Sequence, residues 1–251
     1  MRRAIALSCW VLCAACSAPR APESKPALTV AAAANLTDVF GKVGLAFTAK
    51  TGVEVIFSYG STAQLSQQVE NGAPFDLFAA ADTEHVDSLV SAKKLTEDSR
   101  AVYALGQLAL WIPNGEENGI RDVKDLAASK VRFIAVAQPA LAPYGRAAVE
   151  TLKNAQLWDL LQPKIVYANS ISMAKQMAAT GNADAAFTSY SLVLHEPGVV
   201  VKIAPHLYLP IQQALAIVAS SPRMEEATRF RSFLLGPEGR AILVNGGYLV
   251  P

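Results

Sequence analysis

The feature that most constrains this chain is a regular alternation of short β-rich segments with segments of helical periodicity, starting at residue 27. Such alternation predicts parallel sheet with helices on both faces. In the first part of the chain we expect strands over 28–30, 53–57 and 76–79, and helices over 36–50, 61–71 and 82–92. In the second part we expect strands over 132–137 and 183–188, and helices over 144–154, 171–180, 222–235 and 237–244.

Two longer apolar runs, residues 102–112 and 207–219, interrupt the alternation. They look like a pair of crossings between two α/β lobes. Lobe 1 would then comprise residues 27–105 with 208–251, and lobe 2 residues 106–207. A single doubly wound sheet is the alternative. At about 225 residues, the chain after its leader is long enough for one large or two small cores.

The N-terminal 26 residues are expected to be a leader and tether rather than part of the fold. Arg2 and Arg3 precede a mostly apolar stretch over 4–15, which is shorter than the ~20 residues of a spanning helix and typical of an export signal. A buried amphipathic helix is the alternative. Residues 17–26 contain three prolines and are expected to be extended.

All three cysteines lie in this leader, so the rest of the chain has neither a disulfide framework nor thiolate chemistry. Cys16, between small residues, resembles the acylated cysteine of a bacterial lipobox, although Cys13 occupies the place of the usual aliphatic residue. The alternatives are a lipid-anchored protein and a cleaved periplasmic one. Residues 27–251 carry 18 Lys and Arg against 20 Asp and Glu, which argues against nucleic acid as a partner.

Small and hydroxyl-bearing residues recur where strands pass into helices. In open α/β sheets, ligands bind beyond the carboxyl ends of the strands. The first N–H groups of a helix lack partners and carry positive partial charge, so these junctions can bind an anion without a charged side chain. The junctions are residues 31–38, 58–64, 79–82, 141–145 and 169–172, with further hydroxyls at the strand end 187–191.

Each junction also has a purely structural interpretation as a helix cap. Asn35 and Asp82 are good N-cap residues, and Ser61 with Gln64 fits a capping box. The adjacent hydroxyls of Ser61 and Thr62 are more than one cap requires. The recurrence of such junctions in both expected lobes favours an anion held in a cleft between them.

The order of these motifs over residues 28–251 resembles the periplasmic molybdate-binding proteins of ABC transporters. The most specific stretch is Glu70-Asn71-Gly72-Ala73-Pro74-Phe75-Asp76-Leu77-Phe78-Ala79-Ala80-Ala81-Asp82. Further matching segments are residues 31–37, 61–65, 143–145, 157–159 and 233–239.

The resemblance implies a two-lobed type II periplasmic-binding-protein fold that closes about the two crossings. Each lobe would hold a mixed or mostly parallel sheet flanked by helices. It also implies capture of molybdate, and of tungstate, which is nearly the same size. The partner would be an inner-membrane ABC transporter permease, and the protein would be a monomer without cofactor or cation site. The oxyanion would be held by hydroxyls and backbone amides of Asn35, Ser61, Thr62, Ala81, Tyr144, Ile171 and Ser189, with Tyr190 as the alternative to Ser189.

Two other functions compete with this interpretation. A binding protein for sulfate, phosphate or an organic anion would share the same features. An exported hydrolase would need a nucleophile and base. The chain has only His85, His195 and His206, and it lacks both a G-x-S-x-G elbow and an H-E-x-x-H motif, so we expect no enzyme.

Overall fold

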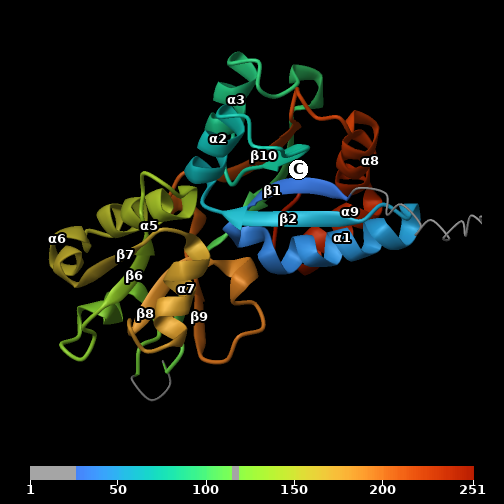
Figure 1. The fold of residues 1–251 in the computed structure, drawn as a ribbon. Coiled ribbons are helices and arrows are strands. Elements are labelled where there is room, and N and C mark those ends of the chain that lie inside the picture. The colour runs from blue at the N-terminus through green and yellow to red at the C-terminus, as the bar shows by residue number, and fades with distance from the viewer. Residues whose placement is uncertain (1–26, 115–118) are drawn as a thin grey trace, which may run out of the picture.

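The computed structural model describes residues 27–114 and 119–251, and it contains two five-stranded sheets (Figure 1). The sheet of lobe 1 has the order β2-β1-β3-β10-β4, and that of lobe 2 the order β7-β6-β8-β5-β9. The two-lobed fold expected from the sequence is therefore confirmed, and a single doubly wound sheet is wrong. The exact lobe boundaries stay a prediction. The expected leader, with Arg2, Arg3 and Cys16, lies outside the described residues.

The strands of lobe 1 are β1 Leu28–Ala33, β2 Val55–Gly60, β3 Leu77–Ala79, β4 Ala101–Gly106 and β10 Ile211–Ile217. Those of lobe 2 are β5 Leu108–Ile112, β6 Ile134–Ala137, β7 Ile165–Ala168, β8 Ala185–Ser189 and β9 Val199–Lys202. Both sheets are mixed. β1 pairs in parallel with β2 and β3, and β6 with β7 and β8. β10 and β5 are antiparallel to their neighbours.

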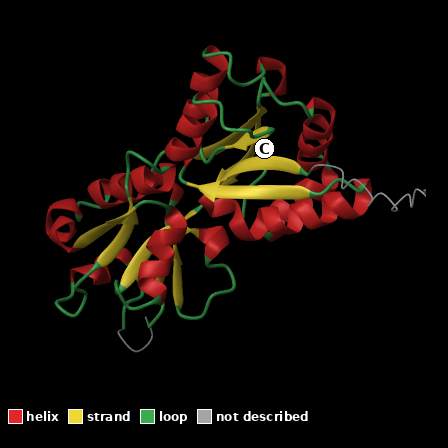
Figure 2. Cartoon of the chain, in the orientation of Figure 1, coloured by secondary structure: helices red, strands yellow, loops and turns green. Residues whose placement is uncertain are grey.

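Helices cover both faces of each sheet (Figure 2). The α-helices are α1 Thr37–Thr51, α2 Thr62–Glu70, α3 Glu84–Ser91, α5 Pro143–Asn154, α6 Trp158–Leu161, α7 Ile171–Ala179, α8 Met224–Leu235 and α9 Pro237–Asn245. The 3-10 helices are η1 Ala34–Leu36, η2 Glu97–Ser99, η3 Val123–Ala127, η4 Gln162–Lys164, η5 Tyr190–Leu192 and η6 Pro205–Leu207. In the described part, no helix is long and apolar enough to cross a bilayer.

The core explains why the strands are such continuous apolar runs. In lobe 1, α1 and α8 pack on one face of the sheet through aromatic residues such as Phe40 and Phe230, while α2 and α3 pack on the other. In lobe 2, α5 and α7 cover opposite faces. A strand buried on both faces has no polar side to alternate with, and five of the six residues of β1 are accordingly buried.

The chain passes between lobes at the first expected crossing. β4 ends at Gly106 and β5 begins at Leu108, so the run 102–112 consists of two strands in different sheets, with Gln107 between them. The second run differs from expectation. Most of 207–219 is β10, which belongs entirely to the sheet of lobe 1, and the return crossing is residues 203–210. Periodicity does not distinguish a buried strand from an apolar connection.

Candidate anion-binding site

The strand-to-helix junctions of the two lobes meet at one small cavity. Its lining comes from lobe 1 at η1, the start of α2 and the end of β3, and from lobe 2 at the starts of α5 and α7. The volume of the cavity is about 10 Å³. Its lining is Ala33, Ala34, Asn35, Gly60, Ser61, Thr62, Ala81, Ala142, Pro143, Tyr144 and Ile171, all uncharged. Six of the seven predicted ligand residues are among them, and Ser189 is not; ligand contact by any of them stays a prediction.

Main-chain N–H groups are the site's principal donors. Thr62 and Ile171 are the first residues of α2 and α7, and Tyr144 is the second residue of α5. N–H groups at such positions have no acceptor within their own helix. In the part of the chain that the structure describes, these three also find no backbone acceptor elsewhere. The helix dipoles add positive potential at the same place, so the cavity suits an anion.

The hydroxyl of Thr62 is held by the backbone of the neighbouring strand end. Its Oγ1 accepts a hydrogen bond from the buried N–H of Ala81 at 3.1 Å. Because a hydroxyl also carries one proton, Thr62 keeps a donor for a ligand. The N–H of Ala81, which we expected to donate to the ligand, donates to Thr62 in this structure.

Ser61 occupies the N-cap position of α2, but its side chain does not cap the helix. Its Oγ donates to Gln64 Oε1 at 2.8 Å instead, so the predicted capping box is wrong. The N–H of Ala63 in the same turn donates to the Leu141 carbonyl of lobe 2 at 3.2 Å. This bond brings the two lobes together beside the cavity.

Asn35 is likewise not a helix cap. The N-cap positions of η1 and α1 are Ala33 and Leu36, and neither helix has a side-chain cap. Asn35 Nδ2 donates to Gln213 Oε1 and to Tyr248 Oη, each at 2.9 Å. Since an amide nitrogen has two N–H groups, none is left for a ligand, and only the backbone N–H of Asn35 remains available.

Ser189 lies behind the cavity rather than in it. Its Oγ donates to Tyr144 Oη at 3.1 Å and shares a 2.7 Å hydrogen bond with Ser191. Tyr190, the alternative, does not line the cavity, and Lys202 Nζ lies 4.0 Å from the centroid of its ring.

These contacts belong to a buried network of hydroxyl and amide groups that joins the lobes. We call it the interlobe network; its members are Asn35, Tyr103, Tyr144, Ser189, Ser191, Gln213 and Tyr248. Burial raises the pKa of Tyr103 and Tyr144 well above the ordinary value, and that of Tyr248 to about 12. The phenols therefore stay protonated at neutral pH. Sequence reasoning missed Tyr103, Gln213 and Tyr248, and it placed Ser191 only among the hydroxyls of the strand end 187–191. The one usable signal was Gln213, a polar residue inside an apolar run.

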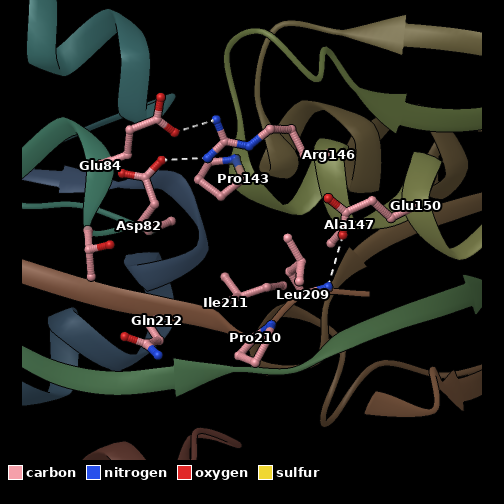
Figure 3. Close-up of a pocket in the computed structure, with 12 residues that line it drawn as sticks. Asp82, Glu84, Pro143, Arg146, Ala147, Glu150, Leu209, Pro210, Ile211 and Gln212 are labelled. Atoms are coloured by element: carbon pink, nitrogen blue, oxygen red, sulfur yellow. Dashed lines mark hydrogen bonds and ion pairs between the residues drawn. The ribbon is translucent and has the colours of Figure 1, made fainter. Parts of the chain in front are cut away.

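Charged side chains gather at a second, larger cavity between the lobes, of about 470 Å³ (Figure 3). Arg146 of α5 reaches across to lobe 1, with Nη2 2.9 Å from Asp82 Oδ2 and Nη1 3.0 Å from Glu84 Oε2. His85 Nδ1 lies 2.9 Å from the same Asp82 oxygen. Burial acts to raise the pKa of Asp82, but the hydrogen bonds and charge of His85 and the charge of Arg146 outweigh it and lower that pKa.

The helix expected over 82–92 begins later than predicted, at Glu84. The N-cap position of α3 is Thr83 rather than Asp82. Asp82 nevertheless accepts the backbone N–H of His85 through Oδ1 at 3.2 Å. Among residues 27–114 and 119–251, no group of three or more His, Cys, Asp or Glu side chains is arranged to hold a metal ion.

Comparison with known proteins agrees with this geometry. Residues 28–249 match the family described as bacterial extracellular solute-binding protein. The chain is 33% identical over 229 residues to the molybdate-binding protein ModA of Rhodobacter capsulatus, covering 91% of this chain and 90% of that protein.

Solved structures give the same result. The periplasmic molybdate-binding protein of Azotobacter vinelandii superposes with a TM-score of 0.83 at 31% identity, covering 89% of this chain and 99% of that one. The sulfate-binding protein SubI of Mycobacterium tuberculosis superposes with a TM-score of 0.75, covering 89% of this chain and 86% of that one. At 21% identity, the second likeness concerns the fold alone.

Proposed function

This chain belongs to the bacterial extracellular solute-binding proteins, and we propose that it captures molybdate between its lobes and delivers it to an ABC transporter permease. Such a family works outside the cytoplasm and is not a class of enzymes. The observation that carries the proposal is the small cavity at which uncharged N–H and O–H donors from both lobes converge. The relatives at 33% and 31% identity, named as molybdate-binding, support the same ligand.

The donors of the cavity favour an anion that carries no proton. Phosphate keeps a proton near neutral pH, and that proton needs an acceptor. An unsatisfied buried polar group costs about 1–3 kcal/mol, so a lining that offers mainly donors discriminates against protonated oxyanions. Molybdate, tungstate and sulfate are fully deprotonated dianions at this pH and meet the requirement.

The size of the cavity narrows the ligand further. The cavity volume is about 10 Å³. So small a cavity favours an ion of few atoms over a sugar or a coenzyme. Molybdate and tungstate differ little in size and should both bind, whereas sulfate, whose oxygens lie closer to the central atom, should bind more weakly.

We assign the direct contacts to groups that have no hydrogen-bond acceptor among residues 27–114 and 119–251. These are the backbone N–H groups of Asn35, Thr62, Tyr144 and Ile171, together with the Thr62 hydroxyl. Ser61 would join them if its hydroxyl turned away from Gln64. Ala81 would act through Thr62, and Ser189 through Tyr144.

The proposal extends to how the protein is held outside the cytoplasm. Residues 1–26 would direct export, and Cys16 would carry a lipid that anchors the chain through residues 17–26. The protein would act as a monomer, because each chain contains both halves of the cavity. Metabolic labelling with a palmitate analogue, compared between the parent and Cys16→Ser, tests the anchor.

A thermal shift experiment tests the ligand class. A ligand that binds only the native state stabilises it by about 2.7 kcal/mol when present at about 100 times Kd. Molybdate and tungstate should raise the melting temperature at micromolar concentrations, and sulfate only at much higher ones. A rise with phosphate or a sugar and none with molybdate would overturn the proposal.

A further inference from the structure

Gln213 joins the two lobes although it does not line the cavity. It lies in β10 of lobe 1 and is fully buried. Its Oε1 accepts hydrogen bonds from Asn35 Nδ2 at 2.9 Å and Tyr103 Oη at 3.0 Å. Its Nε2 donates to Tyr144 Oη of lobe 2 at 2.9 Å. One side chain therefore links two cavity-lining residues, Asn35 and Tyr144, that belong to different lobes.

The backbone of β10 is irregular at this residue. The pairing of β10 with β4 shifts register between Gln213 and Ala214. A bulge of this kind redirects the side chains of its strand and is frequent next to functional sites. Here it accompanies a buried amide in a strand whose other residues, apart from Gln212, are apolar.

Gly106 leaves room for the hydrogen bond between Gln213 and Tyr144. A Cβ at Gly106 would overlap Tyr144 Oη and would lie 2.6 Å from Gln213 Nε2. Gly106 is the last residue of β4, directly before the crossing at Gln107. Its conformation is one that other residues adopt, since its φ is not positive. The need for glycine at this position is therefore a need for space around the interlobe bond.

We propose that Gln213 is a positioning residue for anion capture, which holds Asn35 and Tyr144 at the separation their N–H donors need and so stabilises the closed cleft. This inference rests on the proposed function for its ligand. It predicts that Gln213 affects affinity through the closed conformation, without touching the anion. The loss should therefore appear in the dissociation rate and leave the association rate nearly unchanged, because the open cleft keeps its donors.

A double-mutant cycle on molybdate affinity tests the assignment. Gln213→Met and Tyr144→Phe should each raise Kd by about tenfold through faster dissociation. Both variants break the bond between Gln213 Nε2 and Tyr144 Oη, and each also breaks a bond that the other keeps. The double variant should therefore raise Kd by clearly less than the product of the two single effects. Multiplying effects would contradict the proposal.

Ser99→Ala is the matched control for lost stability. Ser99 is buried, and its Oγ accepts the N–H of Ile217 in the same strand β10 at 2.8 Å, away from the cavity. The Ser99→Ala variant should have a lower melting temperature than the parent. Its molybdate Kd should stay within about twofold of the parent's, as expected for a site outside the interlobe network. An equal loss of affinity in Ser99→Ala would reduce the role of Gln213 to general stability and overturn the inference.

The width of the ligand-free cleft separates this inference from the proposed function. Spin labels at Asn71→Cys and Asp159→Cys, both exposed and in different lobes, report the width once Cys9, Cys13 and Cys16 are serine. Gln213→Met and Tyr144→Phe should shift the distances to longer values without any ligand, and Tyr144→Phe suffices if Gln213→Met does not fold. Unchanged distances would overturn the inference. A parent that fails to bind molybdate while the distances shift would overturn only the proposed function.

Discussion

At the scale of single residues, the cavity depends on which hydrogen-bond donors are already used. Both side-chain N–H groups of Asn35 and the backbone N–H of Ala81 are used inside the protein. Among the described residues, the Thr62 hydroxyl proton and the backbone N–H groups of Thr62, Tyr144 and Ile171 have no acceptor within the protein. If the anion binds as we propose, the backbone supplies most of its donors, and most substitutions at the cavity would act by moving the backbone.

Thr62 allows a direct test, with the hydroxyl as the variable. Thr62→Val removes a ligand donor and also the acceptor of the buried Ala81 N–H, so it should cost about 1–3 kcal/mol of unfolding free energy. It should also weaken molybdate binding by about tenfold or more. Thr62→Ser keeps the hydroxyl and should retain near-parental affinity. If Thr62→Val also binds molybdate like the parent in calorimetry, the Thr62 hydroxyl does not contact the anion.

Ser61 provides the contrasting case at the adjacent position. In the described part of the chain, the Ser61 Oγ makes no cap and bonds to Gln64 alone. Ser61→Ala should therefore lower the unfolding free energy by less than the ~0.5–2 kcal/mol of a lost N-cap. Chemical denaturation without ligand measures this value. A loss at the upper end of that range would show that Ser61 caps α2 in solution.

The sequence predicts where the cavity residues lie, but not which hydrogen bonds their side chains make. The sequence predicted the junctions around Asn35, Thr62, Tyr144 and Ile171 because small and hydroxyl residues before a helix are a local signal. The hydrogen-bond partners of these side chains can lie far away in the sequence. Asn35 is 178 residues from Gln213, its hydrogen-bond partner. No pattern within one segment specifies that contact.

At the scale of elements, helix starts provide donors while a charged contact between helices helps to hold the lobes together. Most helix positions follow from periodicity, and Pro143 and Pro237 begin α5 and α9 as first-turn prolines do. Caps and crossings were predicted less well, because Leu36 and Thr83 take cap positions without using a side chain. Likewise, the apolar composition of the run 207–219 does not indicate whether it forms a strand or a connection between the lobes.

The Arg146 ion pairs should contribute modestly to closure. The Arg146 side chain is 40% exposed, so the contribution is about 0–1 kcal/mol, and Arg146→Met should raise the molybdate Kd by no more than about fivefold. Added salt should reduce the difference from the parent. Arg100→Met is the control, because Arg100 pairs with Asp87 inside lobe 1. A similar affinity loss in Arg100→Met would contradict a specific role of Arg146 in closure.

The pH dependence of this contact follows from the lowered pKa of Asp82. A carboxylate whose folded-state pKa is lowered adds stability above its unfolded-state pKa, and that stability is lost as pH falls through the folded value. Unfolding free energies of the parent and Asp82→Asn should therefore differ most above about pH 4 and converge below it. A difference that grows on acidification would contradict the sign of the shift.

At the scale of the whole molecule, the two lobes are joined by direct contacts. Bonds across the lobes include Ser172 Oγ to the Ala34 carbonyl at 2.9 Å, together with the contacts of Gln213 and Arg146. A ligand shifts an open–closed equilibrium only if it binds the closed form better, and an anion held by both lobes does so. The sequence predicted two lobes and two crossings, but it could not specify how far they close, which depends on the interlobe contacts.

Closure should be visible in solution as a change of shape about Gln107 and residues 203–210. Saturating molybdate should reduce the radius of gyration measured by small-angle scattering, and Gly106→Ala should give a larger radius without ligand because its Cβ displaces Tyr144 and Gln213. A radius that is identical with and without ligand would argue against capture by closure.

The most direct measurement for the central claim, an unprotonated oxyanion held by donors from both lobes, is calorimetric titration of the parent with molybdate, tungstate, sulfate and phosphate under one condition. The account predicts one site per chain, tight and similar affinity for molybdate and tungstate, and much weaker affinity for sulfate. It predicts no detectable phosphate binding at neutral pH, because the proton of phosphate would lack an acceptor. Phosphate binding as tightly as molybdate, or no molybdate binding at all, would contradict the account.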